Sequence, residues 1–105
     1  MLNNNNIFSF RNSYNSYNNN FNTLMLAINE GMNLLRNSSP NNPISEDMVI
    51  IWQKYVFSIL NIISTSCNQN IILEYNSFLL TMNAPTPQDK LCRSIEKLLD
   101  MSKGI

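Results

Sequence analysis

Few side chains in this sequence belong to the types that carry out acid–base or nucleophilic chemistry. The chain has 105 residues, no histidine and two cysteines, Cys67 and Cys92. Histidine is the commonest general base and a frequent zinc ligand, so its absence removes both roles. A cysteine nucleophile needs a neighbouring base, and these two cysteines have no metal-type spacing. We interpret them as small buried thiols in a reducing compartment, and a disulfide between them is the alternative.

Carboxylate pairs are the other group of side chains that could do chemistry. Glu46 and Asp47 are adjacent, but acidic residues directly after a serine such as Ser45 are typical of the first turn of a helix. Glu74 and Glu96 lie in separate segments and would meet only through tertiary packing. The chain has only two glycines and no glycine-rich phosphate-binding motif. The sequence therefore predicts a non-enzymatic protein without a cofactor or a metal.

The charged residues are sparse and balanced. The chain has seven basic and seven acidic residues. Charged residues make up 13% of the chain, against roughly 25% in typical globular proteins. Binding to a phosphate backbone depends on a net basic surface, so we expect no nucleic-acid partner. A neutral surface gives little repulsion between molecules, which favours association with a protein partner or a second copy.

The N-terminal tail, residues 1–20, has a biased composition. Nine of these residues are asparagine, a bias that is typical of AT-rich genomes, and Arg11 is the one charged side chain. Because the asparagine amide competes for the backbone, we expect this tail to be flexible and disordered. Aromatic residues interrupt the asparagines and could fold onto a partner, which makes them candidate interface residues: Phe8, Phe10, Tyr14 and Tyr17.

The same composition is compatible with a targeting role for the tail. Bacterial type III export signals are similarly poor in charge and rich in serine and asparagine. Organellar transit peptides are also acid-poor and serine-rich, although they contain more arginine. A secretory signal peptide is not indicated, because no apolar stretch follows a basic start. We expect a cytoplasmic protein, with export and an organelle as the alternatives.

The longest apolar stretch, residues 48–63, predicts a helix that the rest of the chain must cover. Trp52, the sole tryptophan, lies away from the polar side of this helix and should be buried. A membrane span needs roughly 20 apolar residues, and Gln53 and Lys54 interrupt this stretch, so a membrane role is disfavoured. The polar positions recur at helical spacing and form one stripe: Asp47, Lys54, Ser58, Asn61 and Thr65.

Three further amphipathic helices are predicted around this one. Residues 21–36 have apolar side chains at steps of three and four, and Gly31 could allow another helix to approach closely. Residues 71–82 form a second helix, with a strand over residues 71–75 as the alternative. The last helix starts with Thr86 and Pro87 as capping residues. Its apolar stripe consists of Leu91, Ile95, Leu98 and Leu99.

These patterns together predict an all-α fold, a small bundle of about four helices over residues 21–105 with a buried central helix. Leu73 and Leu80 fall outside the main apolar face of their helix, so we expect them at a contact with a protein partner or a second copy. The predicted function is a non-enzymatic protein–protein interaction module, such as an adaptor, chaperone, inhibitor or small subunit. The alternatives are an exported effector or secretion-apparatus component, and a small subunit of an organellar membrane complex.

Overall fold

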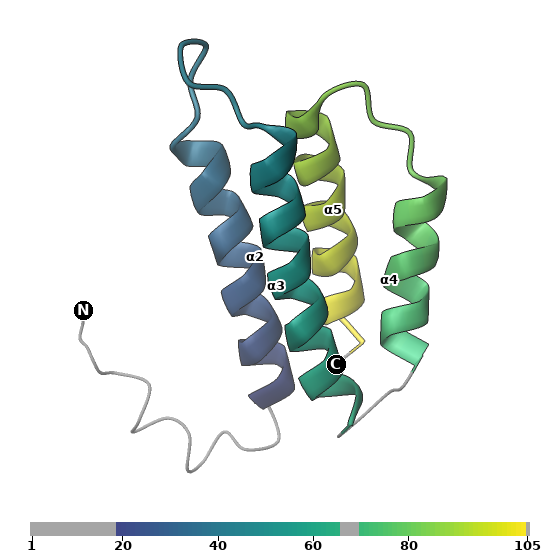
Figure 1. The fold of residues 1–105 in the computed structure, drawn as a ribbon. Coiled ribbons are helices and arrows are strands. Elements are labelled where there is room, and N and C mark those ends of the chain that lie inside the picture. Colours follow the sequence, from purple (N-terminus) through teal and green to yellow (C-terminus); the bar gives the residue numbers. More distant parts are fainter. Residues whose placement is uncertain (1–18, 66–69, 105) are drawn as a thin grey trace, which may run out of the picture.

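The structure is a computed structural model that describes residues 19–65 and 70–104. Its elements are four α-helices, α2 (Asn19–Arg36), α3 (Glu46–Ser64), α4 (Asn70–Thr81) and α5 (Pro87–Ser102). Each helix runs antiparallel to the one before it, and the α2–α3 and α4–α5 loops lie at the same end of the bundle (Figure 1). The part of the chain that the structure describes contains no β-strand, so the all-α prediction is confirmed.

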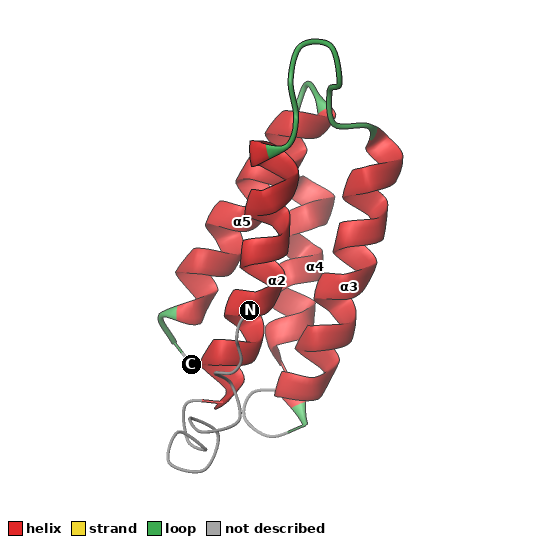
Figure 2. Ribbon diagram, turned by 90° about the vertical axis from the view of Figure 1, so that its left-hand side faces the viewer, coloured by secondary structure: helices red, strands yellow, loops and turns green. Residues whose placement is uncertain are grey.

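The four helices form a bundle in which α2 and α4 lie on opposite sides of the pair formed by α3 and α5 (Figures 1 and 2). α3 packs against each of the other three helices, and so does α5. Among the described helices, α2 and α4 each make extensive contact with α3 and α5 but not with one another. The helix that contains Trp52 is therefore central to the bundle, as predicted.

Local capping chemistry sets the start of α3. Ser45 has an extended backbone, and its hydroxyl accepts a hydrogen bond from the Met48 amide at 3.2 Å. Glu46 and Asp47 occupy the first turn, where a negative charge is favourable next to the positive end of the helix dipole. The predicted start of this helix is thus confirmed, and the adjacent carboxylates have a structural explanation.

Gly31 allows α2 to approach the aromatic ring of Trp52 very closely. A Cβ atom at Gly31 would lie 2.9 Å from Cε2 of Trp52 and 2.9 Å from Cδ1 of Ile95. The Trp52 indole nitrogen donates a hydrogen bond of 2.8 Å to the Ala27 carbonyl, which holds the ring against α2. Trp52 is only 3% exposed, so its predicted burial is confirmed.

The prediction that the rest of the chain covers the apolar surface of α3 is only partly correct. The face toward the other helices is buried, but Ile51 is 68% exposed and Ile62 is 61% exposed. Met48, Ile50 and Tyr55 are also exposed over more than a third of their surface. The reason is geometric, because three short neighbours in a bundle of this size cover one side of a helix and leave the other side in solvent.

The remaining elements agree with the sequence patterns, with three adjustments. α2 begins at Asn19, two residues before the helix start predicted at Phe21. Residues 71–75 belong to α4, so the alternative strand is wrong. Leu99 is half-exposed at the edge of the α5 stripe, and the stripe ends instead with buried Met101. Three residues separate Leu98 from Met101, which keeps both on the core-facing side.

α5 is held at both of its flanks by ion pairs. Its first turn is capped by the Thr86 hydroxyl, which accepts from the Asp89 amide at 3.0 Å. Lys90 pairs with Glu46 of α3 at 2.7 Å, and Lys97 pairs with Glu74 of α4 at 2.9 Å. Both lysines therefore tie α5 to its neighbours.

As for membranes, no helix in the described ranges has the length and apolar character that a span requires.

Candidate protein-binding groove

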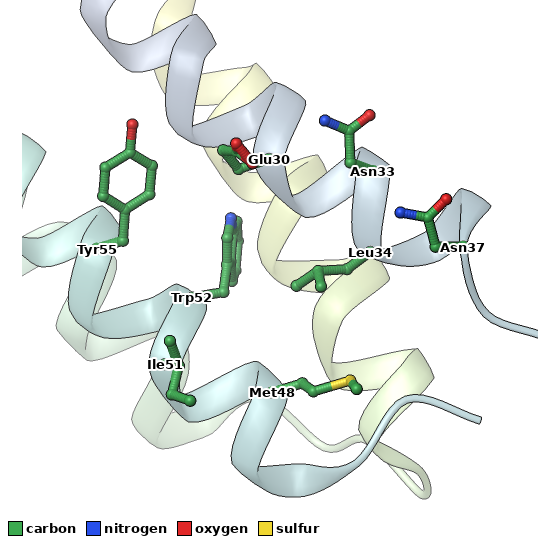
Figure 3. Close-up of a pocket in the computed structure, with 8 residues that line it drawn as sticks. All are labelled: Glu30, Asn33, Leu34, Asn37, Met48, Ile51, Trp52 and Tyr55. Carbon is green, nitrogen blue, oxygen red and sulfur yellow. The ribbon is translucent and has the colours of Figure 1, made fainter. Parts of the chain in front are cut away.

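A groove of about 800 Å³ opens between α2 and α3, at the end of the bundle near their connecting loop. Its walls come from two antiparallel helices, with the Trp52 ring between them (Figure 3). The residues that line it are Glu30, Asn33, Leu34, Asn37, Met48, Ile51, Trp52 and Tyr55.

The wall that α3 contributes is apolar. Met48, Ile51 and Tyr55 are spaced by three and four residues, so they lie on one side of the helix. All three are exposed, whereas Trp52 beside them is fixed by its hydrogen bond to α2. The groove therefore presents free apolar side chains over a rigid base.

The wall that α2 contributes is mainly polar. Glu30, Asn33 and Asn37 follow one another at helical spacing, and Leu34 adds an apolar side chain beneath them. Arg36 donates a hydrogen bond to the side-chain oxygen of Asn33. Glu30 is the only charged residue that lines the groove, and it takes part in neither of the two ion pairs found among the described residues. The groove consequently offers one unpaired negative charge beside an apolar surface.

Exposed apolar side chains continue from this groove toward the other end of the bundle. Leu26 precedes Glu30 by four residues, and Ile62 follows Tyr55 by seven, so each lies on the same side of its helix as the groove. Both side chains are exposed. Two exposed apolar side chains therefore lie between the groove and the end of the bundle where α2 begins, although the polar Ser58 separates Tyr55 from Ile62 on α3.

The residues that the sequence singled out as interface candidates lie elsewhere. Leu73 is 64% exposed and Leu80 is 78% exposed, both on the outer side of α4, so both are accessible to a partner, while their place at a contact stays a prediction. α4 lies on the far side of the central pair from α2 (Figure 1), and these leucines do not line the groove. The other candidates fall outside the described residues: Phe8, Phe10, Tyr14 and Tyr17.

A second, more polar hollow lies between α4 and α5, and Cys92 is one of its lining residues. Burial of the Cys92 thiol raises its pKa, and the negative charges of Asp89 and Glu96 raise it further. A raised pKa lowers the fraction of thiolate, which is the nucleophilic form of the side chain. Cys92 carries a free thiol. Cys67 lies outside the described residues.

One buried hydroxyl in the core has no obvious catalytic use. Tyr75 of α4 is fully buried in the core. Its ring meets the Phe57 ring edge-on, with 5.4 Å between the two centroids. No group in the described ranges lies within regular hydrogen-bond geometry of its hydroxyl. Burial raises the Tyr75 pKa, and the nearby Ser94 hydroxyl offsets part of that rise. Ser94 itself donates to the Lys90 carbonyl at 2.8 Å, which is a structural contact.

Neither a metal centre nor a relative guides the interpretation. Within residues 19–65 and 70–104, no cluster of three or more His, Cys, Asp or Glu side chains could hold a metal ion. The sequence matches no known protein family and no curated protein, and its fold matches no solved structure. The functional interpretation therefore rests on the groove and the exposed apolar side chains described above.

Proposed function

We propose that this protein is a non-enzymatic protein–protein interaction module that binds a partner segment in the groove between α2 and α3. The observation that carries the proposal is the group of exposed apolar side chains in a concave surface, Met48, Ile51 and Tyr55. An apolar centre bordered by polar groups is the usual anatomy of a protein interface. Here Asn33 and Asn37 supply the polar border.

The energetics of burial support the same proposal. Complete burial of an isoleucine side chain stabilises by roughly 1.5–3 kcal/mol. Ile51 is 68% exposed in the isolated chain, so most of this stabilisation would be gained only when a partner covers the side chain. Tyr55 adds an aromatic ring with a polar tip, a type that is enriched at interfaces. Met48 is unbranched and adapts to differently shaped ligands. These three side chains could anchor an extended or helical segment of a partner.

The titratable groups favour binding over catalysis. The Cys92 thiol has a raised pKa, which makes it a poor nucleophile. The carboxylates of Glu46 and Glu74 are each engaged by a lysine. The groove itself contains one carboxylate, Glu30, and no basic side chain among the described residues that line it.

The outer side of α4 is a second candidate contact. Leu73 and Leu80 are separated by seven residues and are among the most exposed large apolar side chains. The notion that they lie at a contact with a second copy stays a prediction. The proposals of an exported protein and of a targeting signal rest on residues 1–20, of which the structure describes only Asn19 and Asn20.

Site-specific photo-crosslinking tests the proposed function. A benzophenone amino acid at position 51 of the full chain would be irradiated in the producing cell, and the crosslinked protein identified by mass spectrometry. Position 50 is the matched control, since Ile50 is a partly exposed isoleucine on the other flank of the same helix.

Binding of the identified partner would then be measured with purified proteins. Removal of a central anchor costs about 1–3 kcal/mol, so Ile51→Asn should weaken binding by about tenfold or more. Ile50→Asn should leave the affinity almost unchanged. Equal affinities for wild type and Ile51→Asn would show that the groove is not the binding surface.

A further inference from the structure

We propose that the groove has an internal ligand, the N-terminal residues 1–18 of the same chain, with Phe8 and Phe10 against the α3 wall and Arg11 opposite Glu30. The inference rests on the proposed function, because it assigns an intramolecular occupant to the same groove. A protein partner would have to displace this occupant in order to bind.

The chemistry of the two surfaces is complementary. Residues 1–18 contain four aromatic side chains, one basic side chain and no acidic one. The groove contains exposed apolar side chains and one carboxylate that no described cation neutralises. Without Arg11 the chain has six basic and seven acidic residues, so the rest of the protein carries the opposite charge to this segment. The pairing of Arg11 with Glu30 joins these two charges.

The length of the segment fits the distance that it must cover. Glu30 lies eleven residues into the chain from Asn19, and a helix rises 1.5 Å per residue, which places Glu30 about 16 Å along α2. Arg11 lies eight positions before Asn19. If about three of them reverse the chain direction, the remaining five span about 17 Å when extended. Arg11 would then lie level with Glu30.

An extended segment would also direct its aromatic residues correctly. Side chains alternate between the two sides of an extended chain, so Phe8, Phe10 and Tyr14 share one side and Arg11 lies on the other. The aromatic side would face Met48 and Ile51, and the arginine would reach the polar border of the groove.

Two exposed apolar side chains mark a path from the start of α2 to the groove. Ile62 and Leu26 lie between the two places, and both are exposed. A tethered segment is present at an effective concentration of about millimolar, which favours it over a second copy of the chain at micromolar concentration. Tethering and complementary chemistry thus favour the chain's own segment as the occupant.

The test uses the full chain with a benzophenone amino acid in place of Phe10. Irradiation should give links within one chain to groove residues, above all Met48 and Ile51, with a yield that does not fall on dilution. Ile51→Asn should lower that yield by about tenfold, and Ile50→Asn should not. Asparagine is used because an aspartate at position 51 would itself attract Arg11. Circular dichroism would verify that each variant retains its helices.

A charge exchange tests the assigned register. Arg11→Glu and Glu30→Arg should each lower the yield by about two- to fivefold, the range for an exposed ion pair, and the double variant should restore it. Asp100→Arg makes the same change in charge on the exposed side of α5 and is the matched control.

Several outcomes would overturn the inference. Links that fall on dilution would assign the groove to a second copy, and links to α4 or α5, or no links, would refute docking altogether. The same holds if the charge exchange does not restore the yield. None of these outcomes decides the proposed function, since the affinity of a partner for wild type and Ile51→Asn is measured separately.

Discussion

Gly31→Ala sets two effects of opposite sign against each other in the core of this bundle. Alanine in a helix interior is favoured over glycine by about 1 kcal/mol, so on propensity alone the variant would be more stable. The added methyl group, however, would lie 2.9 Å from Trp52 Cε2, 3.0 Å from Trp52 Cζ2 and 2.9 Å from Ile95 Cδ1. Such distances require the neighbouring atoms to shift.

The structure indicates which effect is larger. The end of the Ile95 side chain can rotate away, but the Trp52 ring is rigid and its nitrogen is bonded to the Ala27 carbonyl at 2.8 Å. Overpacking of a close-packed core costs about 1–3 kcal/mol. We therefore expect Gly31→Ala to lower the free energy of unfolding by about 1 kcal/mol net, which corresponds to about 4–8 °C in Tm for a domain of this size.

Thermal and urea unfolding, followed by circular dichroism, would measure the change. Gly104→Ala is the matched control, because its Cβ would lie 3.7 Å from the nearest atom, the Met101 carbonyl oxygen, which is an ordinary contact. That variant should change stability by a few tenths of a kcal/mol at most. Ile95→Val removes the Cδ1 atom and should recover part of the loss in the double variant. A Gly31→Ala protein as stable as wild type would refute the packing argument.

Three further predictions concern single features of the fold. Trp52→Ala should cost about 3–5 kcal/mol, and the wild-type tryptophan emission should be blue-shifted; emission like that of free tryptophan would contradict its burial. Tyr75 has a raised pKa, so the folded state retains its proton and stability should fall as the pH rises above about 10. Tyr75→Phe should weaken this decline and leave stability near neutral pH almost unchanged, as urea titrations at several pH values would show. Leu73→Asp with Leu80→Asp should abolish any self-association seen by light scattering, and an unchanged mass would exclude α4 from the contact.

The helices and their starts could be predicted from the sequence because the forces that set them are local. A serine or threonine that caps free amides acts within three residues, and Ser45 and Thr86 do so in the structure. The apolar periodicity likewise identifies the face that packs. Gly31 was interpretable for the same reason, since glycine in an otherwise regular amphipathic helix indicates a close approach.

The groove could not be predicted in this way. Met48, Ile51 and Tyr55 are apolar, and a single sequence gives apolar residues of a central helix as buried. Whether they are buried depends on how many neighbours the chain can supply and where these lie. Four helices leave the outer side of α3 uncovered. The lack of a further helix to cover it is a property of the whole bundle and not of the α3 sequence. Leu73 and Leu80 were identifiable because their own helix already had a complete apolar face.

The positions of the two exposed apolar surfaces allow both to be occupied at once. The groove lies between α2 and α3, and the leucines lie on the exposed side of α4, a helix on the other side of the central pair from α2 (Figure 1). A ligand in the groove and a second copy at α4 would therefore not exclude each other. Because the two sites share no side chain, Ile51→Asn should affect only the groove and Leu80→Asp only α4, and their effects should add. Coupling between the two variants would mean that one surface serves both contacts.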